Sequence, residues 1–92
     1  MNEITVTPSD RGPGQFDVAV GGGARPSTFK VTVPAGLPAK LGDPDPETLV
    51  RESFVFLLER EPVSSIMGEF SLDVISRYFP EYEREIASRL AR

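Results

Sequence analysis

The spacing of apolar residues changes once along this 92-residue chain, at Pro34, and that change constrains the fold more than any other feature of the sequence. Before Pro34, apolar residues alternate with polar or small ones, in the groups Ile4 and Val6, then Phe16, Val18 and Val20, then Phe29, Val31 and Val33. Alternation with a period of two is typical of strands with one buried face. After Pro34, the spacing becomes helical. The sequence therefore predicts a single domain, 1–92, with a strand half (1–34) and a helical half (35–92).

Two segments rich in Gly and Pro, Ser9–Gly14 and Gly21–Pro26, separate the three predicted strands. Both are short enough for hairpin turns, and glycine supplies the positive φ angles that such turns need. We therefore expect a three-stranded antiparallel β-meander with one polar, solvated face. The expected fold class is α+β, with the helical C-terminal half packed on the other face of the sheet.

The clearest helix start lies at Asp45, which can cap a helix whose first position is Pro46. We predict that this helix runs to about Glu61, before Pro62. Its apolar residues cover more than half of the helix circumference, which is more than one sheet face normally covers. We therefore expect this to be the central, most buried helix, with the flank that carries Leu49 and Phe56 facing a further helix or a second subunit.

The remaining segments have weaker patterns. We predict about one helical turn near Leu37–Leu41, ended by Gly42, and a connector with a short helical turn over residues 63–70. Two C-terminal helices are expected, over about 72–78 and 80–91, because Pro80 lacks an amide hydrogen and interrupts the apolar stripe. Arg77 with Glu81 and Glu85 with Arg89 form i,i+4 pairs that support these helices modestly.

The chain contains no histidine and no cysteine, which removes the commonest general base, the commonest thiol nucleophile and the soft metal ligands. We expect no enzyme, no cofactor and no metal. The net charge of −4 offers no field that attracts nucleic acid or an anionic membrane. Without a leader-like start, an apolar span or cysteine, the sequence fits a cytoplasmic protein.

Three short motifs have plain structural explanations. The carboxylates of Asp43–Glu47 resemble a calcium loop only superficially, because the required downstream glycine and glutamate are missing, and helix capping explains them better. Ser64 and Ser65 have no histidine to activate them. The triple glycine that begins at Gly21 lacks the following helix and lysine of a phosphate loop, and it is expected in a hairpin.

Two groups of residues are candidates for an interaction surface. Tyr78 and Tyr82, beside Phe79, form an aromatic segment with polar tips, a type of segment that is enriched at interfaces and also at core edges. Leu49 and Phe56 form the flank of the over-wide apolar helix. We therefore expect a small non-enzymatic interaction or regulatory module that binds a protein partner or forms a homodimer.

Parts of the chain resemble a group of small uncharacterised bacterial proteins of about 90 residues. The similar segments are Phe29–Pro34, Ser53–Pro62 and Val74–Tyr82, so the resemblance covers most of the chain from Thr28 onward. The resemblance implies a bacterial single-domain protein and carries over no functional residue.

The segment Thr28–Pro34 is also similar to the opening strand of ribbon-helix-helix proteins, which implies an alternative function as a DNA-binding regulator or antitoxin. In that family the polar strand residues, here Thr28, Lys30 and Thr32, would contact bases from a dimeric ribbon. Three features depart from the pattern. The charge is acidic, two strands precede the ribbon, and the first helix after it is only about one turn long.

Overall fold

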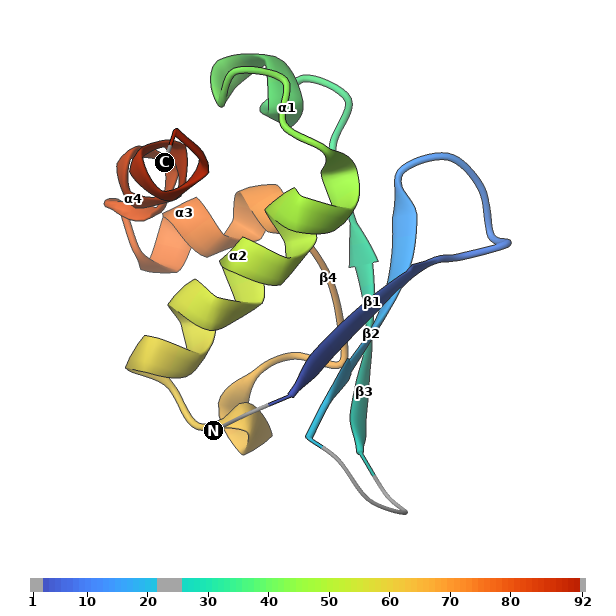
Figure 1. Cartoon of the computed structure of the whole chain (residues 1–92). Helices are drawn as coiled ribbons and strands as arrows, with labels where there is room; N and C mark the ends of the chain where they lie inside the picture. The colour runs from blue at the N-terminus through green and yellow to red at the C-terminus, as the bar shows by residue number, and fades with distance from the viewer. Residues whose placement is uncertain (1–2, 22–25, 92) are drawn as a thin grey trace.

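The computed structural model describes residues 3–21 and 26–91, and it has two layers, a twisted sheet and a set of helices that cover one of its faces (Figure 1). The α+β class is confirmed. No helix in the described ranges is long and apolar enough to cross a membrane. Of the turn predicted at Gly21–Pro26, residues 22–25 lie outside the described ranges.

The sheet has the strand order β1-β2-β3-β4, where β1 is Ile4–Pro8, β2 is Gln15–Val20, β3 is Ser27–Thr32 and β4 is Glu69–Ser71. The first three strands form the predicted antiparallel meander, with Val6 opposite Val18 and Val18 opposite Phe29. These three residues are buried, whereas their neighbours along each strand are exposed or half-buried. The period-two pattern therefore identified both the strands and the covered face.

The prediction of three strands is wrong, because β4 adds a fourth that runs parallel to β3. Its register places Val31 beside Phe70, and the Lys30 amide donates to the Gly68 carbonyl at 2.8 Å. A three-residue strand is too short to show a period, so this segment reads as a connector in the sequence. The sheet is therefore mixed, and the helical half contributes one of its edges.

The central helix α2, Pro46–Arg60, begins and ends where the sequence predicts. The Asp45 carboxylate accepts a hydrogen bond from the Thr48 amide at 3.1 Å, which confirms the cap. At the other end Glu61 adopts an extended conformation before Pro62, as residues before proline prefer. A short helix α1, Leu37–Lys40, precedes α2, and Gly42 follows it with a φ of 85°.

The helices after α2 are short and interrupted. A 3-10 turn η1 spans Val63–Ser65, and a second one, η2, spans Leu72–Val74 and continues into α3, Ile75–Tyr78. The last helix, α4, is Tyr82–Leu90. Phe79 is extended, with φ −130° and ψ 90°, and it separates α3 from α4 just before Pro80. The predicted interruption at Pro80 is therefore confirmed.

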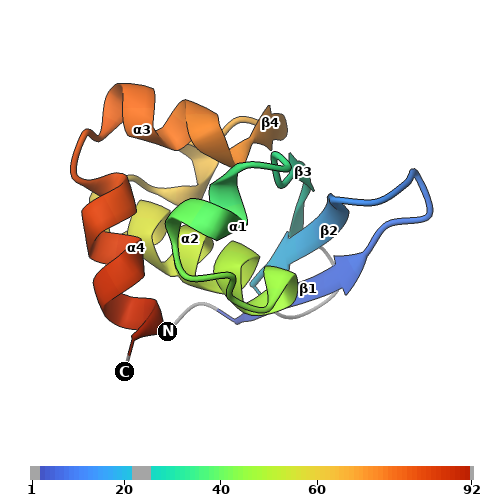
Figure 2. The ribbon, with the colours of Figure 1, turned by 90° about the horizontal axis from the view of Figure 1, so that it is seen from above.

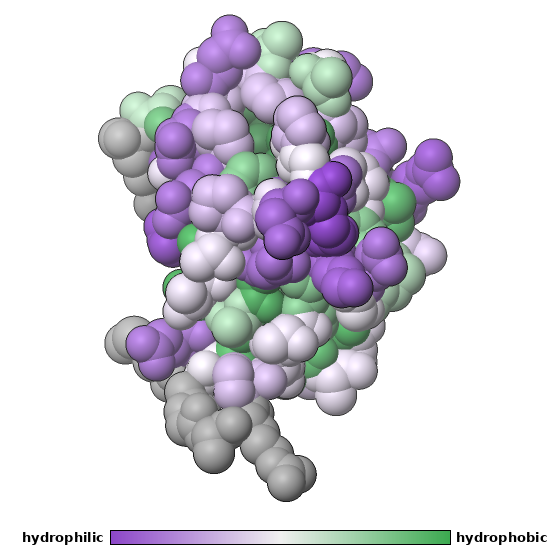
Figure 3. Space-filling model, turned by 90° about the vertical axis from the view of Figure 1, so that its right-hand side faces the viewer, coloured by the Kyte–Doolittle hydropathy of each residue, from purple (hydrophilic) through white to green (hydrophobic). Residues whose placement is uncertain are grey.

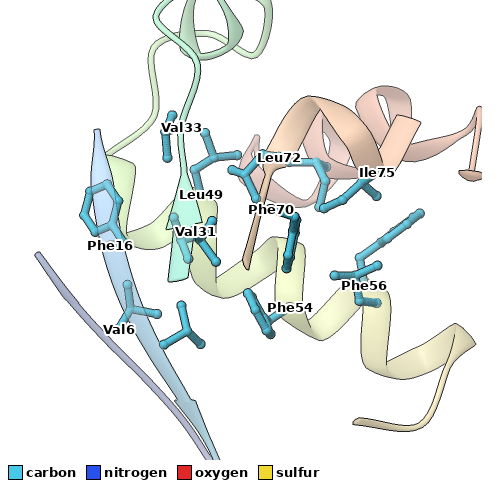
Figure 4. Packing of buried hydrophobic residues seen from close by; sticks show 14 of the residues in the cluster. Val6, Phe16, Val31, Val33, Leu49, Phe54, Phe56, Phe70, Leu72 and Ile75 are labelled. Carbon is cyan, nitrogen blue, oxygen red and sulfur yellow. The ribbon is translucent and has the colours of Figure 1, made fainter. Parts of the chain in front are cut away.

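Helix α2 lies between the sheet and α4, so it is buried on two sides (Figures 1 and 2). On the sheet side, the Phe54 ring lies 5.2 Å from the Phe29 ring and 5.9 Å from the Phe70 ring, measured between centroids. On the other side, the Phe56 ring packs edge-on against Tyr82 at 5.4 Å. Figure 4 shows Phe54 and Phe56 on these two sides of the helix. The wide apolar sweep of α2 therefore serves two contacts within one chain.

One buried hydrogen bond joins α2 to α4. The Ser53 hydroxyl donates to the Leu49 carbonyl at 2.8 Å, and the Ser53 and Tyr82 oxygens are 2.7 Å apart. Because the single Ser53 proton is used by Leu49, the Tyr82 hydroxyl is the donor to Ser53. Both side chains are fully buried. Burial raises the pKa of Tyr82 to about 12.

Gly14 is the glycine whose replacement we expect to cost most. It has a φ of 75°, and a Cβ added there would lie 3.0 Å from the Val33 carbonyl oxygen, whereas Gly42, at φ 85°, has open space. Positive φ costs an L-residue about 1–2 kcal/mol. Measured by urea titration, Gly42→Ala should lower the free energy of unfolding by about that amount, and Gly14→Ala should lower it by more. Equal losses of unfolding free energy in the two variants would show that the chain near Gly14 and Val33 moves apart without cost.

The Ser53–Tyr82 pair predicts an asymmetry between two conservative substitutions. Tyr82→Phe leaves Ser53 bonded to Leu49 and should cost about 1 kcal/mol of unfolding free energy. Ser53→Ala leaves the buried Tyr82 hydroxyl without its acceptor and should cost about 2–3 kcal/mol, although alanine is the better helix former. Urea titration of both variants checks this order. A reversed order would contradict the assigned donor.

Tyr82 also predicts a loss of stability in alkali. Its folded pKa of about 12 lies above the ordinary value of 10.0, so the folded state favours the neutral phenol. The stabilisation is complete below about pH 10 and is lost as pH rises toward 12, by about 1.4 kcal/mol per pH unit. Unfolding free energies measured over this range should fall more steeply for the wild type than for Tyr82→Phe. Parallel curves would contradict the assignment.

Candidate functional site: an apolar groove with an acidic residue

The structure corrects the location of three of the four residues predicted for an interaction surface. Leu49, Phe56 and Tyr82 are fully buried inside the folded chain. Phe56 and Tyr82 contact each other across the α2–α4 junction, so the flank of α2 faces a further helix of the same chain. Only Tyr78 lies on the surface, with 68% of its area exposed.

Tyr78 borders a groove of about 270 Å³ between the C-terminal end of α2, the segment from η1 to β4, and α3. Buried Leu57, Phe70 and Ile75 form part of its lining. Met67 lies at the groove too, with 47% of its area exposed. Met67 and Tyr78 are the two large apolar residues that stand out as exposed in the described part of the chain. The groove therefore gathers the apolar surface that the core leaves uncovered.

The path of the chain explains the groove. Pro62 ends α2, η1 turns the chain, and residues 66–68 lead into β4, where Phe70 turns inward. The turns η2 and α3 then pass back over the end of α2, with Ile75 anchored in the core. Tyr78, on the last turn of α3, points away from the core because Ile75 and Phe79 fill the inward positions. A well-packed frame thus presents the exposed Tyr78 ring.

Sequence reasoning missed Met67 and Ile66, which line the groove in a connector rather than in a helix or strand. The signal was an apolar pair, Ile66–Met67, that belonged to no periodic stripe and stood between Ser65 and Gly68. Large apolar residues in a short polar connector either return to the core or remain exposed. Here Ile66 is half-buried and packs toward the core, whereas Met67 is exposed.

The side chains of the groove suit two kinds of contact, burial of an apolar side chain and attraction of a cation. Its polar side chains are Glu61 and the Ser65 hydroxyl, together with the tip of Tyr78. Its volume is below the roughly 300–1,000 Å³ of typical small-molecule sites. In the ranges 3–21 and 26–91, no group of three or more acidic side chains is placed to hold a metal ion. The size and chemistry fit one or two side chains of another protein.

The arginines near the α2–α4 junction are already engaged. The Arg60 guanidinium lies 3.7 Å from the centroid of the Phe56 ring and 3.2 Å from the Glu81 carboxylate. Arg89 contacts Glu59 at 2.6 Å. This hydrogen bond from Arg89 is the main cause that lowers the pKa of Glu59, and it raises the pKa of Arg89 in turn. These ion pairs join two helices, and they explain the charge on this face without a ligand.

The open face of the sheet carries the residues of the DNA-binding alternative. Thr28 and Lys30 are exposed there, beside a shallow hollow of about 580 Å³, and the Thr32 hydroxyl donates to the Gln15 side chain at 3.0 Å. Figure 3 shows hydrophilic side chains gathered over the middle of this face. In the register, Lys30 stands between Asp17 and Glu69. Two carboxylates therefore flank its charge, which is unfavourable for phosphate.

The position of β3 also differs from that of a ribbon strand. β3 pairs with β2 along its whole length and with β4 through Lys30–Thr32, so it is an inner strand. A two-chain ribbon needs a strand with an unpaired edge, and here β4 would have to leave first. The geometry therefore gives no support to the DNA-binding alternative.

Comparison with known proteins adds no relative. No protein-family model matches this chain, and no curated protein and no solved structure is similar enough to count as a match. The function of the chain is therefore argued from the groove and its surroundings.

Proposed function

We propose that this chain is a small non-enzymatic interaction module that holds a partner protein at the groove between α2, β4 and α3. The observation that carries the proposal is the position of Met67 and Tyr78. These exposed large apolar side chains border the same groove, although they lie in different segments. Exposed apolar surface that is concentrated at one place, rather than scattered, marks interaction sites.

The energetics of the groove favour a protein partner. Covering the exposed parts of Met67 and Tyr78 gains about 25 cal/mol for each Å² of apolar surface removed from water. Tyrosine is among the residues that most often dominate binding energy at interfaces. Ile75 and Phe70 of the groove are buried in the core. Binding should therefore order few side chains, and the loss of conformational entropy should be small. Such a site suits an accessory or regulatory role in which one small domain recognises another protein.

Two further observations support the non-enzymatic part of the proposal. The sequence has no histidine or cysteine to serve as base or nucleophile. The groove brings together one carboxylate and one serine hydroxyl among apolar residues, and this set lacks a base that would activate the serine. The absence of cysteine also fits a reducing compartment, and we place the proposed module in the cytoplasm.

The proposal predicts that binding depends on Tyr78 and not on the open sheet face. The tagged full chain is expressed in its native cells and captured with and without nuclease treatment, beside Tyr78→Ala, Thr28→Ala and Lys30→Ala variants. The captured protein is then purified, and its affinity for each variant is measured by calorimetry. We expect Tyr78→Ala to weaken binding at least about tenfold and Thr28→Ala to have no effect, with unchanged melting temperatures.

Thr28 is a matched control because it is also exposed but lies on the other face of the sheet. Two results would contradict the proposed site. One is a partner whose affinity is the same for Tyr78→Ala and the wild type. The other is recovery that depends on nucleic acid and is lost in Lys30→Ala, which would support the DNA-binding alternative instead.

A further inference from the structure

We propose that the groove recognises a segment of another protein in which a bulky apolar side chain stands beside a lysine or arginine. The apolar side chain occupies the groove, and the cation pairs with Glu61. This inference rests on the proposed function and adds the chemistry of the partner.

Glu61 is the charged side chain of the groove, and its carboxylate is not neutralised within the described residues. Six ion pairs are formed in residues 3–21 and 26–91, and none includes Glu61. The neighbouring Arg60 is engaged by Phe56 and Glu81. By contrast, Glu59, Glu81 and Glu85 each contact an arginine. Glu61 is therefore a carboxylate that the fold itself leaves available.

The end of α2 adds to this negative charge. Glu61 is the C-cap residue, and its amide donates to the Leu57 carbonyl at 2.8 Å. The last carbonyls of a helix carry a partial negative charge, equivalent to about half an elementary charge. A carboxylate at this end is unfavourable for the helix, whereas a cation there is attracted by the carboxylate and the helix together. The fold thus favours a cation at one end of the groove.

The residues around the groove add a further carboxylate and aromatic rings that suit a cation. Asp73 is exposed next to the lining residue Val74, and it takes part in none of the ion pairs of the described residues. Arg77, on α3, is exposed as well. The rings of Tyr78 and Phe79 line the groove and can hold a cation over a ring face. The long apolar stems of lysine and arginine also fit against such a lining.

The charge argues against a second copy of this chain as the occupant. A symmetric dimer at this groove would bring the same carboxylates, Glu61 and Asp73, of the two copies toward each other. Each copy carries a net charge of −4, and like charges brought together at an interface are costly. A partner with basic residues gains from the field that a second copy would oppose.

A library of short random peptides, displayed on phage, tests this inference. The library is selected separately on the wild type, on Glu61→Arg and on Asp10→Asn, in which a carboxylate of the distant β1–β2 turn is removed. An arginine at position 61 suits the helix end, so this variant should fold. We expect wild-type and Asp10→Asn selections to enrich an apolar residue beside Lys or Arg, and the Glu61→Arg selection to lose the basic residue.

Selected peptides are then synthesised and titrated against Glu61→Gln and Tyr78→Ala. Glu61→Gln should weaken binding about three- to tenfold at low salt, and added salt should reduce the difference. Tyr78→Ala should abolish measurable binding. Peptides that need Tyr78 but show no basic preference would overturn this inference and leave the proposed site intact. Failure to enrich any sequence, or binding that Tyr78→Ala does not change, would overturn both this inference and the proposed site. A wild-type dimer in sedimentation that Tyr78→Ala dissociates would overturn the choice of occupant alone.

Discussion

The two-sided burial of α2 is the constraint on which the rest of this structure depends. Phe54 meets the sheet at Phe29 and Phe70, while Phe56, two residues later, meets α4 at Tyr82. A chain of this length has one modest core, and here a single helix forms the middle of it. The Ser53–Tyr82 hydrogen bond and the stacking of Arg60 on Phe56 secure the second side, where the contact is between helices. Because α2 is held on both sides, the place where it ends is fixed as well.

Local sequence patterns predict the elements that are long enough to show a period. Val6, Val18 and Phe29 identify the covered face of the meander, Asp45 and Pro46 begin α2, and Pro80 separates the last helices. The strand β4 was missed because it has three residues and is stabilised by a partner about 40 positions earlier in the chain. A residue such as Phe70 looks the same in a connector and in a buried strand, and only the parallel pairing with β3 decides between them.

The candidate site was predicted less well than the fold, for a related reason. The over-wide apolar face of α2 correctly indicates more than one contact, but a helical wheel cannot say whether Phe56 meets α4 or a second chain. Tyr78 and Tyr82 belong to one aromatic segment in the sequence, and yet the extended Phe79 and the start of α4 place one outside and the other inside. The groove itself joins three segments that are close only in the folded chain, and no local pattern contains that information.

The distribution of charge follows from the same architecture and gives the groove its character. Where α2 faces α4, arginines and carboxylates from the two helices meet, and Arg60 and Arg89 form ion pairs with Glu59, Glu81 and Glu85. Beyond the end of α2, Pro62 turns the chain away toward β4, and α3 passes over the groove without an ion pair between its Arg77 and Glu61. Glu61, the first residue after α2, therefore has no ion-pair partner among the described residues. An apolar lining and an available carboxylate meet at this point because the contact that builds the core stops there.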